Sequence, residues 1–588
     1  MIFILKEDVL LLNHLKERFL EDITRLFPES RNTVKDGDEK IIASVRLEEP
    51  KNHEFGDLTT NAAMVLASKI GKKPSDLAIL IKDEIFCRYD EIKEVNIAGP
   101  GFLNIKLKDS FLTEKIIEVF EKHESYGSNY LAEGRKIQIE YVSSNPTGNL
   151  HIGHGRWGVL GDILSKIYSL NGYDVCREYY VNDYGTQARI FAECVKSLYL
   201  EKFGLKYPYP ENGYPRETVS KVAGVLSEKF DDSFIRNKTT LEFDETSFFK
   251  NAIQIMISFI SDTLKSIGVE FDVWFFESSL YEKDLFDKTL DFLKERGLTY
   301  KMDDALWFKS KDFGDDKDRV IIRKDGNPTY FASDIMYLMN KKERGFEYLL
   351  YILGADHHGY ISRLKAIASA IGMDKDKVSI LIGQLVRIIE GKEVQKMSRR
   401  KGKGFTLDDL VAEVGKDAVR YFFSMNSFDT HLDFDIELAK KKSSQNPVFY
   451  VQYAFARVGS IIRKVNESRP VNLDADFISC MDDYGAKPFR NFLSLIEKND
   501  FKNTSERNLA WTILLFPDTV RDACKSDSPY FINQYLYRLA NEFHYFYKHN
   551  KIISKEKVNI KRLLLALAAR LVLRKGLDVL GVSAPERM

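Results

Sequence analysis

The sequence predicts a multidomain protein: an α/β, Rossmann-like domain with a parallel sheet lies between an N-terminal α+β domain and a C-terminal all-α helical bundle. Its length of 588 residues suits roughly three to four domains. Residues 136–181 read as strand, helix and strand, which is a βαβ unit and therefore favours parallel strands. From Leu407 onward the hydrophobic spacing is almost entirely helical.

Turn signals and changes of hydrophobic period give the predicted domain boundaries. A Gly-Pro-Gly turn precedes an alternating strand at residues 102–107, which closes the first unit. Apolar runs at 348–354 and 378–383 restore the alternation of strands and helices after a largely helical stretch. The prediction is an N-terminal α+β domain (1–115), a Rossmann-like domain (116–405) with a helical insertion at about 188–300, a connector (406–445) and a helical bundle (446–588).

The charges are balanced overall but unevenly distributed. Lys and Arg together number 87, as do Asp and Glu. Residues 441–588 contain 24 basic and 15 acidic side chains, a net charge of +9, which leaves −9 for residues 1–440. A basic helical block fits contact with a polyanion such as RNA. An ordinary solvated helical surface is the alternative.

Several classes of protein are disfavoured. No run of 18 apolar residues is present. The apolar stretch at residues 1–5 is too short for the hydrophobic core of a signal peptide, and acidic residues follow it closely. We therefore expect a cytoplasmic protein without a membrane span. The five cysteines form no Cys-x-x-Cys pair, which argues against a zinc ribbon.

Two histidines stand where the first helix of the βαβ unit begins. Residues 148–155 contain His151 and His154 with glycines at 148, 153 and 155. A helix N-terminus offers free N–H groups and a positive dipole end, and two imidazole donors would complete a cradle for a triphosphate. Gly153 leaves room for close approach of an adenine. The alternative is a pair of structural histidines. A zinc site is less favoured because no third Cys or His lies near.

A second basic motif lies in the polar, glycine-rich segment 391–404. It contains Lys396, Met397 and Ser398. A lysine there could neutralise the β- and γ-phosphates while the pentavalent α-phosphorus forms. Taken alone, the segment is typical of a solvated basic loop. Its position after a strand and downstream of the histidines favours ATP binding.

Longer segments resemble the arginyl-tRNA synthetase family of the class I aminoacyl-tRNA synthetases. The resemblance covers nearly the whole chain, including Glu54 to Asp57 and Ala98 to Gly101, and is uninformative only at about 200–300 and 465–500. It is carried by the segments 139–156, 179–185, 329–334, 354–360, 446–454 and 584–588.

The resemblance implies a ligase that activates L-arginine with ATP, forms arginyl-adenylate and transfers arginine to the 3′-terminal ribose of its tRNA. It implies tRNA, L-arginine and ATP as partners, and Mg²⁺ that enters with ATP, without a dedicated protein metal site. It also implies a monomer in which tRNA binds before efficient arginine activation. The N-terminal domain would touch the tRNA elbow and the bundle would bind the anticodon.

The resemblance also implies which residues are functional, from the positions that match the family's motifs. The expected catalytic residues are His151, His154, Lys396 and Ser398. The expected ATP-binding residues are Gly148, His151, Gly153, His154, Gly354, Asp356, His357, Lys396, Met397, Ser398 and Arg399. The expected arginine-binding residues are Glu140, Ser143, Asn145, His154, Tyr330, Asp334 and Asp356. The physical chemistry agrees, since a planar cation with five donors suits carboxylate acceptors and an aromatic face.

Simpler interpretations of these residues stay open. Glu140 could be a surface charge, Asp334 a solvated helix residue, and Asp356 an N-cap. The family often has Lys where this chain has Arg399, and Lys401 could share that role.

In the bundle, the expected tRNA contacts include tyrosines suited to stacking on unpaired bases. Packing of these tyrosines between helices is the alternative. The expected residues are Tyr450, Gln452, Tyr453, Arg457 and Met588.

Three other functions remain possible at this point. A small-acid adenylating enzyme would share the nucleotide site but would not need a basic helical domain. Another class I synthetase would not need Glu140, Tyr330 and Asp334 together. A non-catalytic RNA-binding relative is disfavoured by the intact histidine and Lys-Met-Ser motifs.

Overall fold

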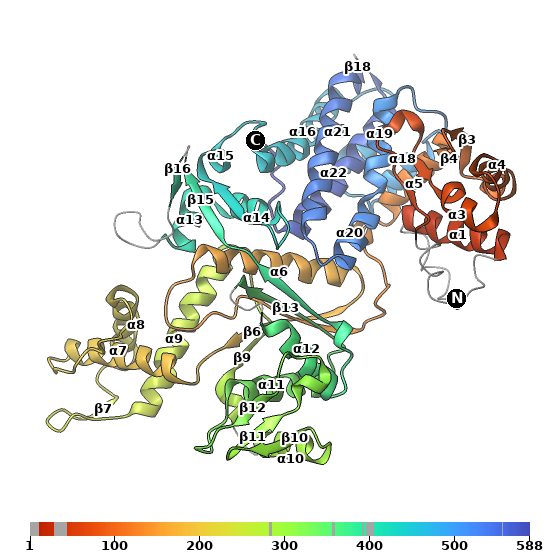
Figure 1. Ribbon diagram of the computed structural model, residues 1–588. Coiled ribbons are helices and arrows are strands. Elements are labelled where there is room, and N and C mark those ends of the chain that lie inside the picture. The colour runs from red at the N-terminus through yellow and green to blue at the C-terminus, as the bar shows by residue number, and fades with distance from the viewer. Residues whose placement is uncertain are drawn as a thin grey trace.

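The chain forms an α/β body with a helical bundle above it and lobes below it (Figure 1). The computed structural model describes residues 11–28, 44–281, 285–355, 359–390, 393–395, 405–554 and 557–588. The predicted architecture is confirmed, because a parallel sheet lies between an N-terminal unit with an antiparallel sheet and a C-terminal bundle.

The N-terminal unit packs helices against a small antiparallel sheet with the strand order β1-β2-β4-β3. The strands are β1 (Leu47–Glu48), β2 (Leu58–Thr60), β3 (Ile92–Ala98) and β4 (Phe102–Leu107). The helices are α1 (Leu11–Leu26), α3 (Ala62–Ile70) and α4 (Pro74–Glu84). Alternate residues of β4 are buried, as the sequence pattern predicts, and α5 (Asp109–Glu121) leads from this unit into the body.

A five-stranded parallel sheet forms the centre of the body. Its order is β14-β13-β5-β6-β9, so the second half of the domain returns to pair beside the first strand. The strands are β5 (Lys136–Glu140), β6 (Asp174–Val181), β9 (Val273–Phe276), β13 (Tyr348–Gly354) and β14 (Val378–Gly383). Helices α6 (Ile152–Leu170), α11 (Tyr330–Glu343) and α12 (Tyr360–Ala370) connect them. A Cβ at Gly161 would lie 2.4 Å from the ring of Tyr141, so helix α6 packs closely on the chain that leaves β5.

The predicted helical insertion ends earlier than expected. Helices α7 (Thr186–Lys202), α8 (Arg216–Phe230) and α9 (Glu245–Ser266), with the hairpin β7 (Ile235–Asn237) and β8 (Glu242–Phe243), form the lobe at the lower left of Figure 1. Strand β9 then returns to the parallel sheet beside β6. A second lobe follows, with α10 (Leu285–Glu295), β10 (Thr299–Met302), β11 (Ala305–Phe308) and β12 (Arg319–Ile322). A four-residue apolar run does not distinguish strand from helix, which is why periodicity overlooked β9.

The connector is not purely helical. It contains α13 (Leu407–Val414), α14 (Lys416–Ser424) and α15 (Ile436–Lys440). Between α14 and α15, β17 (Leu432–Asp435) pairs in parallel with β15 (Val386–Glu390), which also pairs with β16 (Glu393–Gln395). The alternating burial of β17 is the strand signal that the prediction missed.

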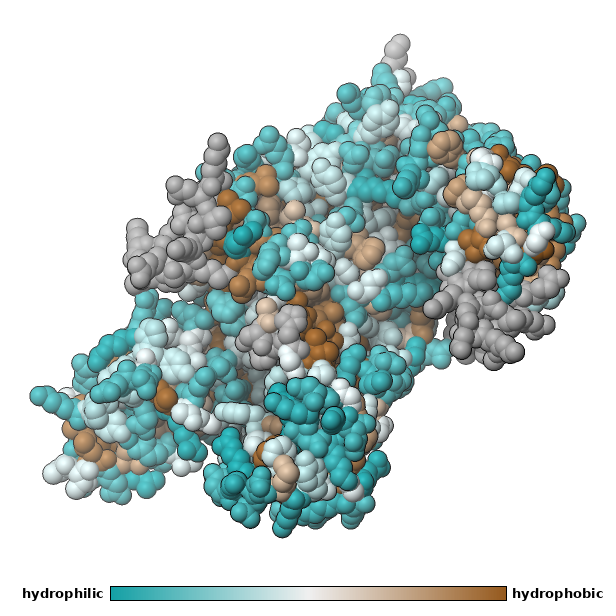
Figure 2. All heavy atoms as spheres, in the orientation of Figure 1, coloured by the Kyte–Doolittle hydropathy of each residue, from teal (hydrophilic) through white to brown (hydrophobic). Residues whose placement is uncertain are grey.

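The C-terminal bundle is helical, as predicted, with one short hairpin. Its helices are α16 (Pro447–Ser468), α17 (Ala475–Ser479), α18 (Lys487–Ser494), α19 (Thr504–Leu514), α20 (Phe516–Lys525), α21 (Tyr530–His549) and α22 (Ile560–Leu580), and its hairpin is β18 (Ile553–Ser554) with β19 (Lys557–Val558). None of the helices among the described residues has the length and apolar character needed to cross a bilayer. Figure 2 shows that hydrophilic side chains cover most of one face of the molecule, with hydrophobic ones near its middle.

Candidate active site

A cavity of about 640 Å³ opens at the carboxyl ends of the parallel strands. This is the edge at which open α/β sheets bind ligands. The structure brings many of the predicted residues together around it. The predicted residues that line the cavity are Glu140, Ser143, Asn145, Gly148, His151, His154, Tyr330, Asp334 and Gly354.

The chain bends sharply where it leaves β5 and enters the cavity. Val142 and Ser143 have φ angles of 68° and 39°, in the left-handed region that side chains rarely adopt. The Ser143 hydroxyl accepts a hydrogen bond of 3.1 Å from the backbone N–H of Tyr180. The Ser144 hydroxyl lies 2.7 Å from the Tyr179 hydroxyl. Contacts with β6 therefore maintain a strained bend that directs this loop toward the cavity.

His151 and His154 stand together at the start of α6, as the sequence predicts. His151 is the N-cap, and its Nδ1 accepts a 3.3 Å hydrogen bond from the backbone N–H of His154. The two rings stack with their centroids 3.5 Å apart, and Trp157 meets both edge-on. Because Nδ1 of His151 is an acceptor, its neutral tautomer carries the proton on Nε2. Gly153 does not line the cavity, but a Cβ there would lie 2.9 Å from Cε1 of His151, so glycine makes the ring pair possible.

Burial keeps the imidazole of His154 neutral. Burial, followed by the nearby His151, lowers the pKa of its imidazole to about 3. Its Nδ1 is buried and has no hydrogen-bond partner among the described residues. His154 can therefore stabilise a phosphate by donating a hydrogen bond rather than by carrying a charge.

Two carboxyl groups face the cavity with raised pKa values. Burial raises the pKa of Asp334, on α11, to about 7, although the Tyr360 hydroxyl donates to both of its oxygens at 3.1 and 2.9 Å. Burial, followed by the charge of Asp183, raises the pKa of Glu277 to about 7. Burial therefore disfavours these charges, and a cation in the cavity would stabilise them.

Glu277 is a functional candidate that the sequence did not reveal. It lies directly after β9, at the carboxyl edge of the sheet, and is 2% exposed. A carboxylate after a short apolar run is a weak signal without knowledge that the run is a sheet strand. Assignment of β9 to the parallel sheet would have been enough to find it.

Glu140 already has a cation partner inside the protein. Its Oε2 accepts from Nζ of Lys341 at 2.6 Å, and the Lys341 side chain is 0% exposed. The same ammonium lies 4.0 Å from the ring centroids of Tyr337 and Tyr351. Glu140 is thus neither a surface charge nor a carboxylate free to bind a ligand with both oxygens. Its expected contact with substrate stays a prediction.

Some predicted residues lie outside the described part of the chain. They are Asp356, His357, Lys396, Met397, Ser398, Arg399 and Lys401. Residues that flank these positions lie at the cavity or contact a residue that lines it. Gly354 ends β13 at the cavity, and Thr406 forms a β-bridge with His151. Among the described residues, no group of three or more His, Cys, Asp or Glu side chains is arranged to hold a metal ion.

A second hollow, of about 620 Å³, lies between α16 and α21 in the bundle. The predicted residues Tyr450, Tyr453 and Arg457 line it together with His544 and Tyr547. The Arg457 guanidinium lies over the rings of Tyr453 and Tyr547, 4.5 and 4.9 Å from their centroids, and one of its nitrogens is 3.0 Å from Nδ1 of His544. Aromatic faces beside a cation form a surface on which unpaired bases can stack.

The other two predicted bundle residues do not line this hollow. Gln452 is buried, and its amide donates to Asp417 and to the backbone oxygen of Ser583, both at 2.9 Å. The amide nitrogen of Gln452 is therefore engaged in holding the C-terminal segment against α14, and its expected contact with tRNA stays a prediction. Met588 is 50% exposed.

Comparisons with known proteins agree along the chain. Residues 115–431 match the model of the class I (R) tRNA synthetase catalytic domain, residues 451–588 the DALR anticodon-binding domain, and residues 13–107 the arginyl-tRNA synthetase N-terminal domain. Proteins named arginine–tRNA ligase in Bacillus velezensis and Bacillus subtilis are 42% and 41% identical to it, with 94% of this chain and 96% of each relative covered.

Two solved structures support the fold. The arginyl-tRNA synthetase of Thermus thermophilus superposes with a TM-score of 0.71 at 19% identity and covers 98% of this chain and 100% of its own. The enzyme of Plasmodium falciparum gives a TM-score of 0.72 at 17% identity and covers 98% of this chain and 99% of its own.

Proposed function

Because the chain belongs to the arginyl-tRNA synthetase family, we propose that its cavity binds ATP at the start of α6 and the arginine guanidinium between Glu277 and Asp334. The protein is an arginine–tRNA ligase of class I. The family's reaction has two steps. The arginine carboxylate attacks the α-phosphorus of ATP, which releases pyrophosphate and gives arginyl-adenylate. The 3′-terminal ribose hydroxyl of tRNA then attacks the mixed anhydride, takes the arginyl group and releases AMP.

Neither step requires a nucleophile from the protein, so the residues of the cavity act by positioning and by stabilising charge. In the proposal, the backbone N–H groups at the α6 N-terminus and the imidazoles of His151 and His154 donate to the triphosphate. Lys396 and Ser398 act on the same phosphates. Two observations support this. Thr406, which follows their segment, bridges to His151, and a Cβ at Gly155 would lie 2.5 Å from Leu407.

The amino-acid side chain is recognised by the acidic end of the cavity. The observation that carries the proposal is that two buried carboxyl groups, Glu277 and Asp334, line the same cavity, and burial raises the pKa of each to about 7. A bound guanidinium offers five donors and a permanent positive charge, so it would stabilise the ionised carboxylates that burial disfavours. Tyr330, 62% exposed at the rim, can cover the aliphatic part of the substrate.

An amino-acid panel tests this assignment. Pyrophosphate exchange is measured in the presence of tRNA with arginine, lysine, citrulline and cysteine. Exchange with arginine alone is expected, because lysine lacks the planar fork and citrulline lacks the charge. Exchange with lysine or cysteine and none with arginine would contradict the proposal.

A pH dependence follows from the two carboxyl groups. Both pKa values are raised, so the carboxylates needed to bind arginine are partly protonated at neutral pH in the free enzyme. We expect kcat/KM for arginine to rise with pH through about 7 and then level off, and the apparent value belongs to the pair rather than to either group. A titration of kcat/KM from pH 5.5 to 8.5 checks this. A flat profile at saturating ATP and tRNA would argue against these groups as the arginine ligands.

The hollow between α16 and α21 is proposed to bind an unpaired base of the tRNA. Arg457→Met should raise KM for tRNA about tenfold, because stacking and cation–π contacts contribute about 1–3 kcal/mol per base. KM for arginine and ATP should stay unchanged. Arg463, which contacts the Glu586 backbone from the same helix, provides the control as Arg463→Met. Equal effects of the two substitutions on KM for tRNA would remove the hollow from the proposal.

The remaining partners follow from the family's reaction. Mg²⁺ is proposed to enter with the phosphates of ATP, where it would neutralise negative charge. The N-terminal unit is proposed to touch the tRNA elbow. We infer a monomer that works in the cytoplasm, where tRNA is used.

A further inference from the structure

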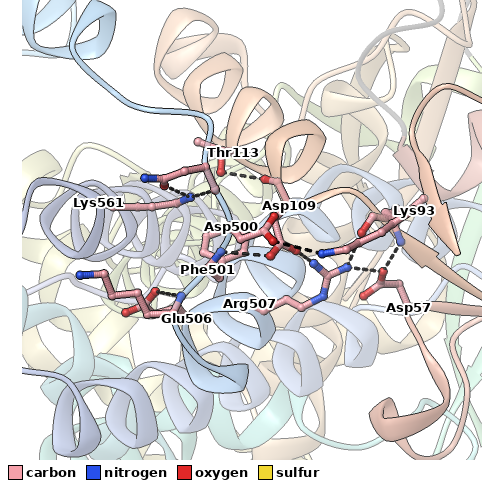
Figure 3. A network of polar contacts seen from close by, with 12 residues as sticks. Asp57, Lys93, Asp109, Thr113, Asp500, Phe501, Glu506, Arg507 and Lys561 are labelled. Carbon is pink, nitrogen blue, oxygen red and sulfur yellow. Dashed lines mark hydrogen bonds and ion pairs between the residues drawn. The ribbon is translucent and has the colours of Figure 1, made fainter.

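One buried arginine of the bundle contacts two segments that are far from it in the sequence. Arg507, on α19, donates to Oδ2 of Asp57 at 2.6 Å and to the backbone oxygen of Leu107 at 2.8 Å (Figure 3). It also forms an ion pair with Asp109, at the start of α5. The three acidic and basic side chains are each at most 11% exposed. Arg507 therefore joins the N-terminal unit, the helix that leads into the body, and the bundle.

The local sequence around Asp57 is built for this contact. Gly56 has a φ of 122°, and a Cβ there would lie 2.6 Å from the backbone oxygen of Ile105, so only glycine allows this approach to β4. Asp57 then donates its N–H to Ile105 at 2.8 Å and accepts the N–H of Leu107 at 2.7 Å. These contacts orient the Asp57 carboxylate toward Arg507. The segment 54–57, which the family resemblance singles out, thus serves a contact between domains.

Other polar contacts connect the same two units. The carboxylate of Asp518, on α20, accepts the backbone N–H groups of Leu12 and Asn13 at 3.0 and 2.9 Å, at the start of α1. The guanidinium of Arg538 meets Glu49 through two hydrogen bonds of 2.8 Å. These directional contacts fix the orientation of the N-terminal unit on the bundle as well as its position.

Exposed ion pairs at this interface provide a contrast. Lys93 and Asp500 are 3.2 Å apart, with side chains 43% and 73% exposed. Exposed pairs of this kind contribute little, because water and salt screen them. Removal of Arg507 would instead leave two buried carboxylates without their cation. The buried contact of Arg507 should therefore contribute more to the attachment than the exposed pair does.

We propose that Arg507 is a positioning residue that locks the N-terminal unit onto the helical bundle, so that tRNA meets both as one preorganised surface. The proposal rests on the function proposed above, in which tRNA is the substrate that spans these units. Without the lock, part of the binding free energy of tRNA is used to order the two units. Arginine and ATP bind in the body, so their binding should not depend on it.

The test compares buried and exposed contacts of one interface in the full-length enzyme. The variants are Arg507→Met, Asp57→Asn, the double variant and, as a matched control, Lys93→Met. Steady-state aminoacylation gives KM for each substrate. Hydrogen exchange without tRNA reports on β4, where the N–H of Leu107 is bonded to Asp57.

Arg507→Met should speed exchange in β4 and raise KM for tRNA about tenfold, with kcat at saturating tRNA and KM for arginine and ATP within about twofold of wild type. The double variant should be no worse than Arg507→Met, since Asp57→Asn removes a contact that Arg507→Met has already removed. Lys93→Met should leave all values unchanged. If Arg507→Met does not fold, Asp57→Asn must give the same pattern.

The lock is ruled out if β4 exchanges faster while KM for tRNA is unchanged. It is also ruled out if all KM values rise together, since this indicates general destabilisation, or if Lys93→Met has an equal effect. Failure of the proposed function would be visible separately, because wild-type enzyme would then not charge tRNA with arginine.

Discussion

Asp334→Asn is expected to lower kcat/KM for arginine by on the order of 10³-fold, since loss of one partner from a buried charge pair costs about 2–5 kcal/mol. The amide keeps the shape of the carboxyl group but removes its charge and turns N–H donors toward a substrate that has only donors. Aminoacylation at varied arginine, with saturating ATP and tRNA, measures the loss. Glu277→Gln should act in the same direction.

The melting temperature of Asp334→Asn distinguishes a loss of arginine binding from a loss of folding. The pKa of Asp334 is about 7 when folded, above the value of 3.8 for a free group, so ionisation of this carboxyl costs stability as pH rises between these values. At pH 7.5 Asp334→Asn should therefore melt no lower than wild type. Asp312→Asn, at an exposed aspartate in the lobe, provides the control for activity. A loss with Asp334→Asn no larger than with Asp312→Asn would remove Asp334 from arginine binding.

His154→Ala is expected to lower kcat for pyrophosphate exchange by about 10²–10³-fold, the usual cost of removing one donor that stabilises transition-state charge. Burial keeps His154 neutral, so the loss is that of a hydrogen bond and of a ring stacked on His151. KM for arginine should change little, because the proposal assigns the guanidinium to Glu277 and Asp334 and not to His154. Exchange at saturating arginine and tRNA measures the effect.

His431→Ala is the matched control, since His431 is exposed beside β17. It should retain wild-type exchange. If His154→Ala exchanges pyrophosphate as fast as His431→Ala, the imidazole pair has no role in adenylate formation.

Local spacing was enough to predict where the histidine pair lies. His151 and His154 lie one helical turn apart in the sequence, and a strand-to-helix junction places both at a helix N-terminus. Their contacts with each other depend on residues within the same turn. The sequence alone therefore contained almost all of this geometry.

The acidic end depends on long-range pairing and was only partly predicted. Glu277 reaches the cavity because β9 pairs with β6, across the whole helical insertion. Lys341, on α11, reaches Glu140, at the end of β5, although 201 residues separate the two in the sequence. Neither contact leaves a local pattern, so the family resemblance implied a substrate contact for Glu140 while its internal partner, Lys341, could not be predicted.

The bundle shows the same limit. Tyr450, Tyr453 and Gln452 lie on one helix, but their side chains have different surroundings. Two tyrosines line the hollow, and Gln452 turns toward Asp417. Helical periodicity gives relative faces, whereas the neighbours that cover each face come from α14 and α21.

The discrimination between arginine and citrulline tests the central claim most directly. Citrulline has nearly the same shape but carries a carbonyl oxygen in place of one guanidinium nitrogen, and it has no charge. If Glu277 and Asp334 recognise a cation, the ratio of kcat/KM for the two amino acids in tRNA charging should exceed about 10⁴. A ratio within about tenfold would mean that the cavity selects by shape alone, and the account would be wrong.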